Sequence, residues 1–137
     1  ASIHGNTAQV AKKLAEMLKE NGAKKVVVSD LSRDDMAEVI EDAFRYPKIV
    51  CCAASYDAGV FPPMHDFLHH LQIKNFQRRQ FAIVENGTWA PTAGKVMRQM
   101  VEGMKQCEIV EPTVTIWGKL KDSDLPNLET LAKKITE

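Results

Sequence analysis

Two kinds of hydrophobic pattern alternate along this chain of 137 residues. In some stretches apolar residues recur every three to four positions, which places them on one side of a helix. In others they form short continuous runs, which are typical of strands buried on both faces. The helical stretches begin near residues 7, 32, 62, 91 and 126, and the strand-like runs cover 24–30, 48–54, 80–84 and 108–117.

Turn and capping residues mark the ends of these elements. Asn21-Gly22 supplies a stop for the first helix, and Ser32 is expected to cap the second, with Asp35 three residues later. Prolines suit a first helical turn, and they are expected to open the other helices. These prolines are Pro62-Pro63, Pro91 and Pro126.

Helices that alternate with buried strands predict an α/β fold, a three-layer αβα sandwich around a parallel sheet. Nothing in residues 1–137 indicates a linker or a repeat, so we expect a single domain. Such a layout normally starts with a strand, whereas this one starts with a helix. We therefore expect that an apolar strand precedes Ala1 and that the domain is part of a longer polypeptide.

The amino-acid composition and net charge limit the kinds of binding partner that are expected. Hydrophobic residues make up 45% and charged residues 26% of the chain, which is typical of a soluble globular protein. Eighteen basic and eighteen acidic residues balance, so neither nucleic acid nor a membrane surface is an expected partner. The chain has no signal-peptide pattern, and its three cysteines, two of them adjacent (Cys51 and Cys52), suggest reduced thiols. A cytoplasmic location is the simplest expectation.

The loop of residues 2–7 (SIHGNT) resembles an anion site. Parallel sheets bind ligands at the carboxyl ends of their strands, and a helix N-terminus offers free N–H groups to an anion there. Ser2 and Thr7 add hydroxyls, Asn6 adds an amide, and Gly5 permits close approach of the backbone. GxxxxGK[ST] and GxGxxG motifs are absent, so a single phosphate fits better than a triphosphate. Plain helix capping by Asn6 or Thr7 is the alternative.

Two further loops are expected at the same edge. Residues 53–63 (AASYDAGVFPP) offer the flat ring of Tyr56 and a turn at Gly59, and residues 85–91 (ENGTWAP) offer Trp89 after the turn Asn86-Gly87. An aromatic side chain on an exposed loop suits a planar ligand. The alternatives are a packed tyrosine on an ordinary surface loop and a tryptophan tucked against the following helix. Together the three loops suit a ligand with a phosphate tail and a flat polar ring.

These loops carry a resemblance to the flavodoxins, and more closely to the flavodoxin-like domain of flavodiiron proteins, at the C-terminal end of those proteins. The segment SIHGNT resembles the T/S-x-x-G-N-T phosphate loop of the family. The segment from Ser55 to Pro63 resembles its P-T-Y-x-x-G-x-x-P-P loop, and Asn86-Gly87-Thr88-Trp89 resembles the segment beside the flavin ring. The similarity runs over essentially the whole chain, and the family's strand order, 2-1-3-4-5, comes with it.

The resemblance implies that the chain binds flavin mononucleotide (FMN) and transfers electrons. In flavodiiron proteins FMN relays electrons from rubredoxin or an NAD(P)H-linked flavin reductase to a di-iron centre that reduces O2 or NO. That centre lies on a metallo-β-lactamase-like domain, which would be a partner in cis or in a dimer mate. The implied cofactor-binding residues are Ser2, Ile3, His4, Gly5, Asn6 and Thr7 in the first loop, Ser55, Tyr56, Asp57, Ala58 and Gly59 in the second, and Asn86, Gly87, Thr88 and Trp89 in the third.

The chain departs from the family pattern at three positions. His4 stands where an aromatic or hydroxyl residue is common, Ala54 replaces a proline, and Glu85 replaces a glycine. The neutral net charge also differs from the acidic free-standing flavodoxins and agrees better with a tethered relay domain.

Two other functions are possible for a domain of this topology. A phospho-acceptor signalling domain of the same topology needs an acidic residue where the 48–54 strand ends, and a docking module would have the fold without the cofactor. His65 and His69 lie one turn apart, but no third metal ligand is evident, and a solvated helix face is expected.

Overall fold

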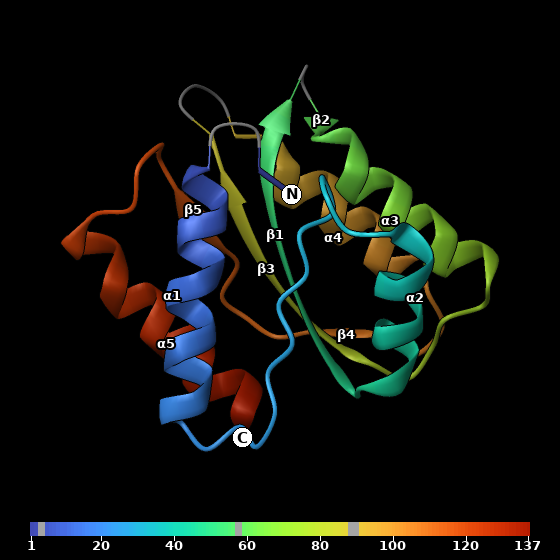
Figure 1. The fold of residues 1–137 in the computed structure, drawn as a ribbon, viewed down its shortest axis with the longest axis horizontal. Helices are drawn as coiled ribbons and strands as arrows, with labels where there is room; N and C mark the ends of the chain where they lie inside the picture. Colours follow the sequence, from blue (N-terminus) through green and yellow to red (C-terminus); the bar gives the residue numbers. More distant parts are fainter. Residues whose placement is uncertain (3–4, 57–58, 88–90) are drawn as a thin grey trace.

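A five-stranded sheet lies between two layers of helices (Figure 1). The computed structural model describes residues 1–2, 5–56, 59–87 and 91–137. The helices are α1 (Asn6–Glu20), α2 (Met36–Arg45), α3 (Pro62–Ile73), α4 (Ala93–Glu102) and α5 (Leu125–Thr136), with a short 3-10 turn η1 (Asp122–Asp124) ahead of α5. The strands are β1 (Lys48–Tyr56), β2 (Gly59–Val60), β3 (Gln80–Asn86), β4 (Glu108–Ile109) and β5 (Val114–Ile116).

The centre of the sheet is the parallel pair β1 and β3, which run in register from Lys48 opposite Gln80 to Ala54 opposite Asn86. Both β4 and β5 pair in parallel with β3, at its start and at its end respectively. The short strand β2 folds back antiparallel on the end of β1. The predicted α/β fold with a parallel sheet is thus confirmed, with β2 as an antiparallel addition.

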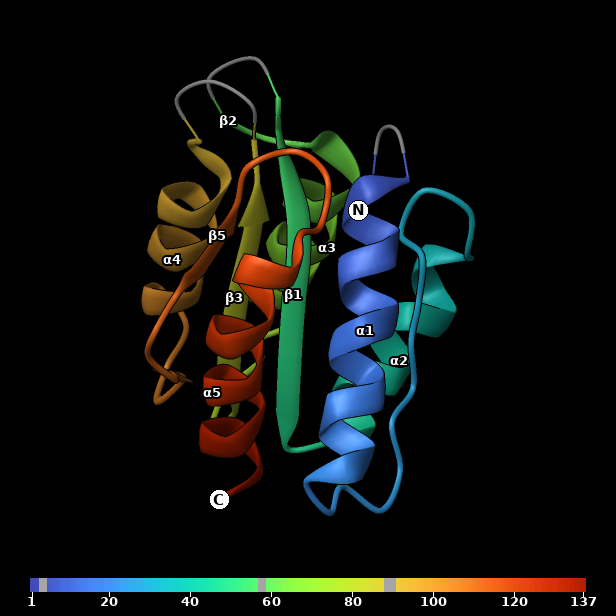
Figure 2. The same ribbon diagram turned by 90° about the vertical axis from the view of Figure 1, so that its left-hand side faces the viewer.

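Each face of the sheet has its own core. α1 and α5 cover one face and α2, α3 and α4 cover the other, as the turned view shows (Figure 2). Successive residues of a strand point to opposite faces, so Cys51 and Ala53 join the core under α2, α3 and α4, while Cys52 joins the other. β3 is buried on both faces from Phe81 to Val84, which explains its continuous apolar sequence.

Residues 24–30 do not form the strand that their β-branched sequence predicts. They run from α1 toward α2 without a regular hydrogen-bonded partner among the described residues. Val27 and Val28 remain 44% and 53% exposed. A strand exists only through its neighbour, so a suitable sequence without a neighbour stays irregular.

Two other boundaries differ from prediction. The cap of α2 is Asp35, whose side chain accepts a hydrogen bond from the N–H of Ala37, and not Ser32. Ser32 is instead held in a turn, where its N–H donates to the Asp30 carboxylate. The predicted strand 108–117 is divided into β4 and β5, separated by a stretch with Pro112, which has no N–H to donate to a ladder.

Burial changes the acidity of the two adjacent cysteines. It raises the pKa of the Cys51 thiol from 9.0 to about 12, aided by the neighbouring Cys52, and raises the pKa of the Cys52 thiol to about 11. The free cysteines are Cys51, Cys52 and Cys107, as expected for reduced thiols. None of the helices in the described ranges is both long and apolar enough to cross a membrane.

These raised values predict a loss of stability in alkali. In the unfolded chain the thiols ionise near pH 9, whereas in the folded chain they stay protonated until about pH 11 to 12. Their contribution to the free energy of unfolding is therefore complete below pH 9 and is lost as the pH rises toward 12. Urea unfolding at pH 8 and pH 10.5 should show a smaller pH-dependent loss in the Cys51→Ala/Cys52→Ala variant than in the natural chain. An equal loss in both would contradict this assignment.

Candidate functional site

Three chain segments reach the same edge of the molecule, at the carboxyl ends of β1 and β3 (Figure 1). The two strands end level, because Ala54 lies opposite Asn86. The start of the chain joins them: the Ala54 N–H donates to the Ala1 carbonyl at 3.2 Å, and α1 begins a few residues later. The three loops that the sequence singles out therefore leave from one edge, where ligands of open α/β sheets bind.

Among the described residues, no side chain accepts the N–H groups of Asn6 and Thr7 at the N-terminus of α1. Gly5, its N-cap residue, has a left-handed backbone with φ of 85°, a conformation that strains other residues. The Gly5 N–H donates to Ser2 Oγ at 2.9 Å, and the first turn contains no acidic residue. Because the first N–H groups of a helix have no partner within the helix, this end is open to an anion.

Thr7 lies in the first turn of α1 and is only 3% exposed. Its hydroxyl is not an orphaned group, because no fully buried side-chain nitrogen or oxygen of the described residues lacks a hydrogen-bond partner. The position combines the hydroxyl of a largely buried residue with the positive end of a helix. Both features suit a phosphate oxygen.

At the same edge, the backbone N–H groups at the N-terminus of α4 already donate hydrogen bonds to side chains of the protein. Ser55 Oγ accepts the N–H groups of Thr92 and Ala93 at 2.9 and 3.0 Å, and Glu85 Oε1 accepts the N–H of Gly94 at 2.9 Å. The other oxygen of Glu85 accepts from Thr115 Oγ1 at 2.7 Å. An anion is therefore expected at α1 and not at α4. Ser55 is predicted to contact the ligand, but its hydroxyl oxygen already accepts these two hydrogen bonds from the N-terminus of α4.

A hairpin presents the aromatic residue of the second loop. β1 and β2 pair so that Tyr56 lies opposite Gly59, and Thr92 Oγ1 donates to the Gly59 carbonyl at 2.8 Å, which ties this hairpin to the start of α4. Tyr56 is 50% exposed, and its ring centre lies 5.7 Å from that of Phe61. The tyrosine is thus supported from behind and open in front, as a surface for a planar ligand requires.

The side chain of Asn86 links the end of β3 to the loop that follows β5. It is 7% exposed, its Nδ2 donates to the Gly118 carbonyl at 2.6 Å, and its Oδ1 accepts the Gly118 N–H at 3.1 Å. The Gly87 N–H donates to the Ile116 carbonyl at 3.1 Å, so the third loop leaves from a fixed base. Asn86 therefore holds the loop after β5 in place, and any contact with a ligand would come from its backbone or from the loop that follows.

Trp117 is a further aromatic residue at this edge, although the hydrophobic pattern predicts it within a strand. Trp117 follows β5 directly and is 54% exposed. β5 ends opposite Asn86, so Trp117 belongs to the same edge of the sheet. An aromatic at the carboxyl end of a parallel strand was the signal that could have identified it.

Several predicted site residues lie outside the described ranges: Ile3, His4, Asp57, Ala58, Thr88 and Trp89. Their roles stay predictions. The rings of His65 and His69 stack with centres 6.2 Å apart, and no group of three metal-binding side chains occurs in the described part of the chain.

The contacts of Glu85 give a prediction. Removing its carboxylate should leave the Gly94 N–H and the Thr115 hydroxyl without partners, so Glu85→Ala should lower the free energy of unfolding by about 1–3 kcal/mol. Glu85→Gln keeps an acceptor for the Gly94 N–H and should lose less. Urea unfolding measures both values, and exchange of the Gly94 amide should quicken in the alanine variant. Equal losses would show that the hydrogen bonds are not responsible.

Solved structures of known proteins share this fold. Rubredoxin oxygen:oxidoreductase of the anaerobe Desulfovibrio gigas matches 98% of this chain with a TM-score of 0.91 and 16% identity, over 33% of its own length. A flavodoxin from the domain Archaea matches 99% of the chain, and 92% of its own, with a TM-score of 0.83 and 20% identity. A flavodiiron protein of Thermotoga maritima matches 97%, over 33% of its own length, with a TM-score of 0.78 and 23% identity.

These comparisons establish a flavodoxin-like fold. No protein-family model matches the sequence, and no curated protein does either. The chain spans about a third of the flavodiiron proteins and over nine tenths of the archaeal flavodoxin. It is thus similar in size to a free-standing flavodoxin and to one part of a flavodiiron protein, as the resemblance of its loops predicts.

Proposed function

We propose that this chain is an FMN-binding electron-transfer module. The observation that carries the proposal is the contrast between the two helix starts at the ligand edge. The side chains of Ser55 and Glu85 accept the first N–H groups of α4, whereas among the described residues no side chain accepts the N–H of Asn6 or Thr7 in α1. A phosphate monoester at α1 would receive the partial charge of the helix and hydrogen bonds from backbone amides.

The residues of the site divide into two groups by role. Gly5, Asn6 and Thr7 at the start of α1, with Ser2, would hold the phosphate; Ile3 and His4 complete that loop. Tyr56, Gly59 and Gly87, with Asp57, Ala58, Thr88 and Trp89, would border the flavin. The hydrogen-bonded bases of both loops would hold this border rigid and exclude water from one side of the ring.

Bound FMN would supply the redox chemistry, accepting and passing on electrons. The chain's own contribution is to bind the tail, to orient the ring and to limit its contact with water. Electron transfer of this kind requires no acid–base pair from the protein.

In a longer protein, this module would relay electrons to a di-iron centre. The support is the similarity to flavodiiron proteins, of which the chain spans about a third. The partner would be a metallo-β-lactamase-like domain, in cis or in a dimer mate, and the protein would act as an O2 or NO reductase. Rubredoxin, which appears in the name of the Desulfovibrio protein, or a flavin reductase would be the donor.

Titration of the purified chain with FMN tests the proposal. FMN fluorescence should be quenched on binding, dithionite should bleach the yellow complex, and riboflavin should bind more weakly because it has no phosphate. Circular dichroism verifies that the chain is folded. A folded chain that binds neither flavin would overturn the proposal, and covalent labelling by acetyl phosphate would favour the phospho-acceptor function.

A further inference from the structure

The second and third loops of the flavin edge are hydrogen-bonded to each other through Thr92. Thr92 Oγ1 donates to the Gly59 carbonyl at 2.8 Å, and the Thr92 N–H donates to Ser55 Oγ at 2.9 Å. Ser55 and Gly59 lie on either side of the turn in the second loop, and Thr92 follows the third loop, three residues after Trp89. One threonine therefore binds both ends of one loop from the end of the other.

These bonds replace the usual cap of α4. Thr92 is the N-cap residue of α4, a position at which a threonine side chain commonly accepts an N–H of its own helix. In the described part of the chain, the Thr92 side chain caps no amide of α4. Ser55 Oγ accepts the Ala93 N–H at 3.0 Å instead, and Glu85 Oε1 accepts the N–H of the next residue at 2.9 Å. Because β1 and β3 supply the caps, the Thr92 hydroxyl can donate outside its own helix.

The start of α4 is fixed closely against the sheet. A Cβ atom added to Gly94 would lie 2.8 Å from the Glu85 carboxylate, which is closer than such an atom can lie. The other oxygen of this carboxylate accepts the Thr115 hydroxyl of β5 at 2.7 Å. Since α4 begins against two strands, Thr92 is a fixed point to which the second loop is attached.

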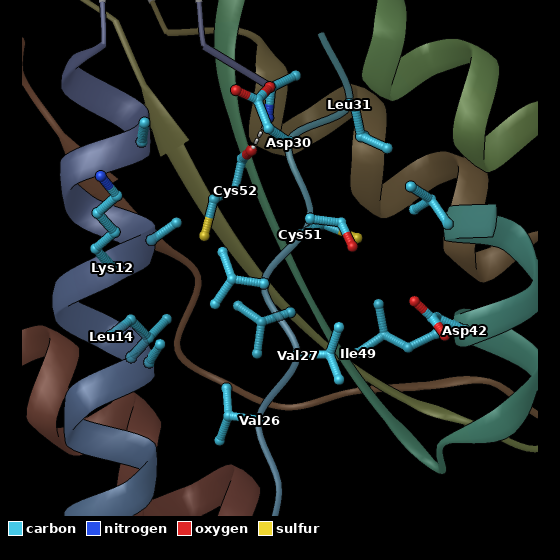
Figure 3. Close-up of a pocket in the computed structure, with 18 of the residues that line it drawn as sticks. Lys12, Leu14, Val26, Val27, Asp30, Leu31, Asp42, Ile49, Cys51 and Cys52 are labelled. Carbon is cyan, nitrogen blue, oxygen red and sulfur yellow. Dashed lines mark hydrogen bonds between the residues drawn. The ribbon is translucent and has the colours of Figure 1, made fainter. Parts of the chain in front are cut away.

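The hairpin of the second loop has little other support along the outer edge of β1. Ile49 and Cys51 of β1 border a cavity of about 730 Å³ on that edge, which Val27 lines as well (Figure 3). At the end of β1 the edge carries β2, a strand of two residues. So short a hairpin is marginally stable by itself. The bonds of Thr92 and Ser55 are therefore important for holding it in place.

We infer that Thr92 is a positioning residue of the flavin site: its hydroxyl holds the second loop against the third, so that the two loops bordering the ring keep their spacing before a ligand arrives. The inference rests on the proposed function, because the spacing matters only if a flat ring lies between these loops. A ligand that enters a site already in place does not lose free energy in ordering it, so the bond should contribute to affinity.

The two threonines of the site then act on different parts of the ligand. Thr7 lies at the start of α1, where the phosphate would bind, whereas Thr92 acts through the loops beside the ring. Loss of the Thr92 hydroxyl should therefore affect FMN and riboflavin equally, because both carry the same ring.

Fluorescence titration of Thr92→Val and Thr92→Ser with both flavins tests this role. Valine removes the hydroxyl, and serine keeps it. We expect Thr92→Val to raise the dissociation constants of FMN and riboflavin by the same factor, about 3- to 10-fold, the usual effect of one neutral hydrogen bond. Thr92→Ser should stay within about twofold of the natural chain. Thr130→Val, which removes a hydroxyl-to-carbonyl bond of the same kind on α5, should change neither constant.

Amide exchange in the flavin-free chain tests the bond itself. The Phe61 N–H donates to the Ala54 carbonyl at 2.9 Å, where the hairpin closes. Its exchange should quicken at least about threefold in Thr92→Val and stay unchanged in Thr92→Ser, because local opening becomes easier without the bond to Gly59. The amide of Ile83, which is fully buried in β3, is the internal control and should exchange alike in all forms.

Three results would overturn the inference. One is binding of both flavins by Thr92→Val as tightly as by the natural chain, and another is a loss limited to FMN, which would place Thr92 at the phosphate. The third is a serine variant that behaves like the valine variant, which would assign the effect to packing. Failure of the proposed function looks different, because the natural chain would then bind neither flavin. Unchanged exchange of Phe61 in Thr92→Val would then still show that Thr92 does not hold the hairpin.

Discussion

Thr7→Val is expected to weaken FMN binding by roughly 10- to 100-fold, the effect of losing one hydrogen bond to a charged group, about 1.5–3 kcal/mol. Valine keeps the shape of threonine but removes the hydroxyl, and Thr7 is buried at the start of α1. The dissociation constant from a fluorescence titration measures the effect. In the proposed site the hydroxyl would contact the phosphate and not the ring.

Riboflavin is the discriminating ligand for this prediction. It has no phosphate, so its affinity should be the same in the natural chain and in the variant. Thr130→Val is the matched control, because the Thr130 hydroxyl donates to the Pro126 carbonyl on α5 and lies far along the chain from the site. If Thr7→Val weakened both flavins equally, the hydroxyl would be acting through the fold, and the phosphate assignment would be wrong.

Leu68→Ala should lower the free energy of unfolding by about 2–5 kcal/mol, the usual cost of a large-to-small change in a packed core. Leu68 is fully buried on α3, in the core that lies under α2, α3 and α4. That core supports β1, whose end carries Tyr56. Urea unfolding measures the loss.

Ile73→Ala is the control for Leu68→Ala. It removes a similar side chain from the same helix, but Ile73 is 64% exposed, so the change should stay within about 0.5 kcal/mol. Similar losses in the two variants would mean that α3 does not bury the face described here.

The hydrophobic pattern predicted the helices and the central parallel pair, because burial repeats at the period of each element. Val10, Leu14 and Met17 form the buried side of α1 at helical spacing. The run from Phe81 to Val84 is buried on both faces, as its continuous apolar sequence indicates. Such patterns are local, and they can be read without knowledge of the neighbours.

For residues 24–30, the prediction of a strand from the hydrophobic pattern is wrong. Their sequence favours a strand as strongly as that of β1, yet β1 has β3 beside it and they have no paired strand among the described residues. Hydrogen bonding between strands is a property of two segments. Sequence periodicity reports on one segment at a time, so it could not separate the two cases.

The candidate site shows the same division. The residue types of the three loops indicated a ligand edge, but not which polar groups the protein uses for itself. Ser55 and Asn86 were expected to contact the cofactor, and the structure finds their side chains bonded to α4 and to Gly118. In the sequence, Glu85 differs from the family pattern, in which a glycine is common. The structure gives a physical reason for a carboxylate there, because Glu85 accepts a hydrogen bond from the Gly94 N–H.

The sequence by itself determined the alternation of helices and strands, the two-faced burial of the sheet and the chemistry available in the loops. These follow from side-chain spacing and from the conformations that glycine, proline and capping residues permit. The tertiary structure decided which helix start is left open to an anion and which polar side chains form hydrogen bonds within the protein. Each of these depends on pairing between groups distant in the chain, and pairing is settled only when the elements pack together.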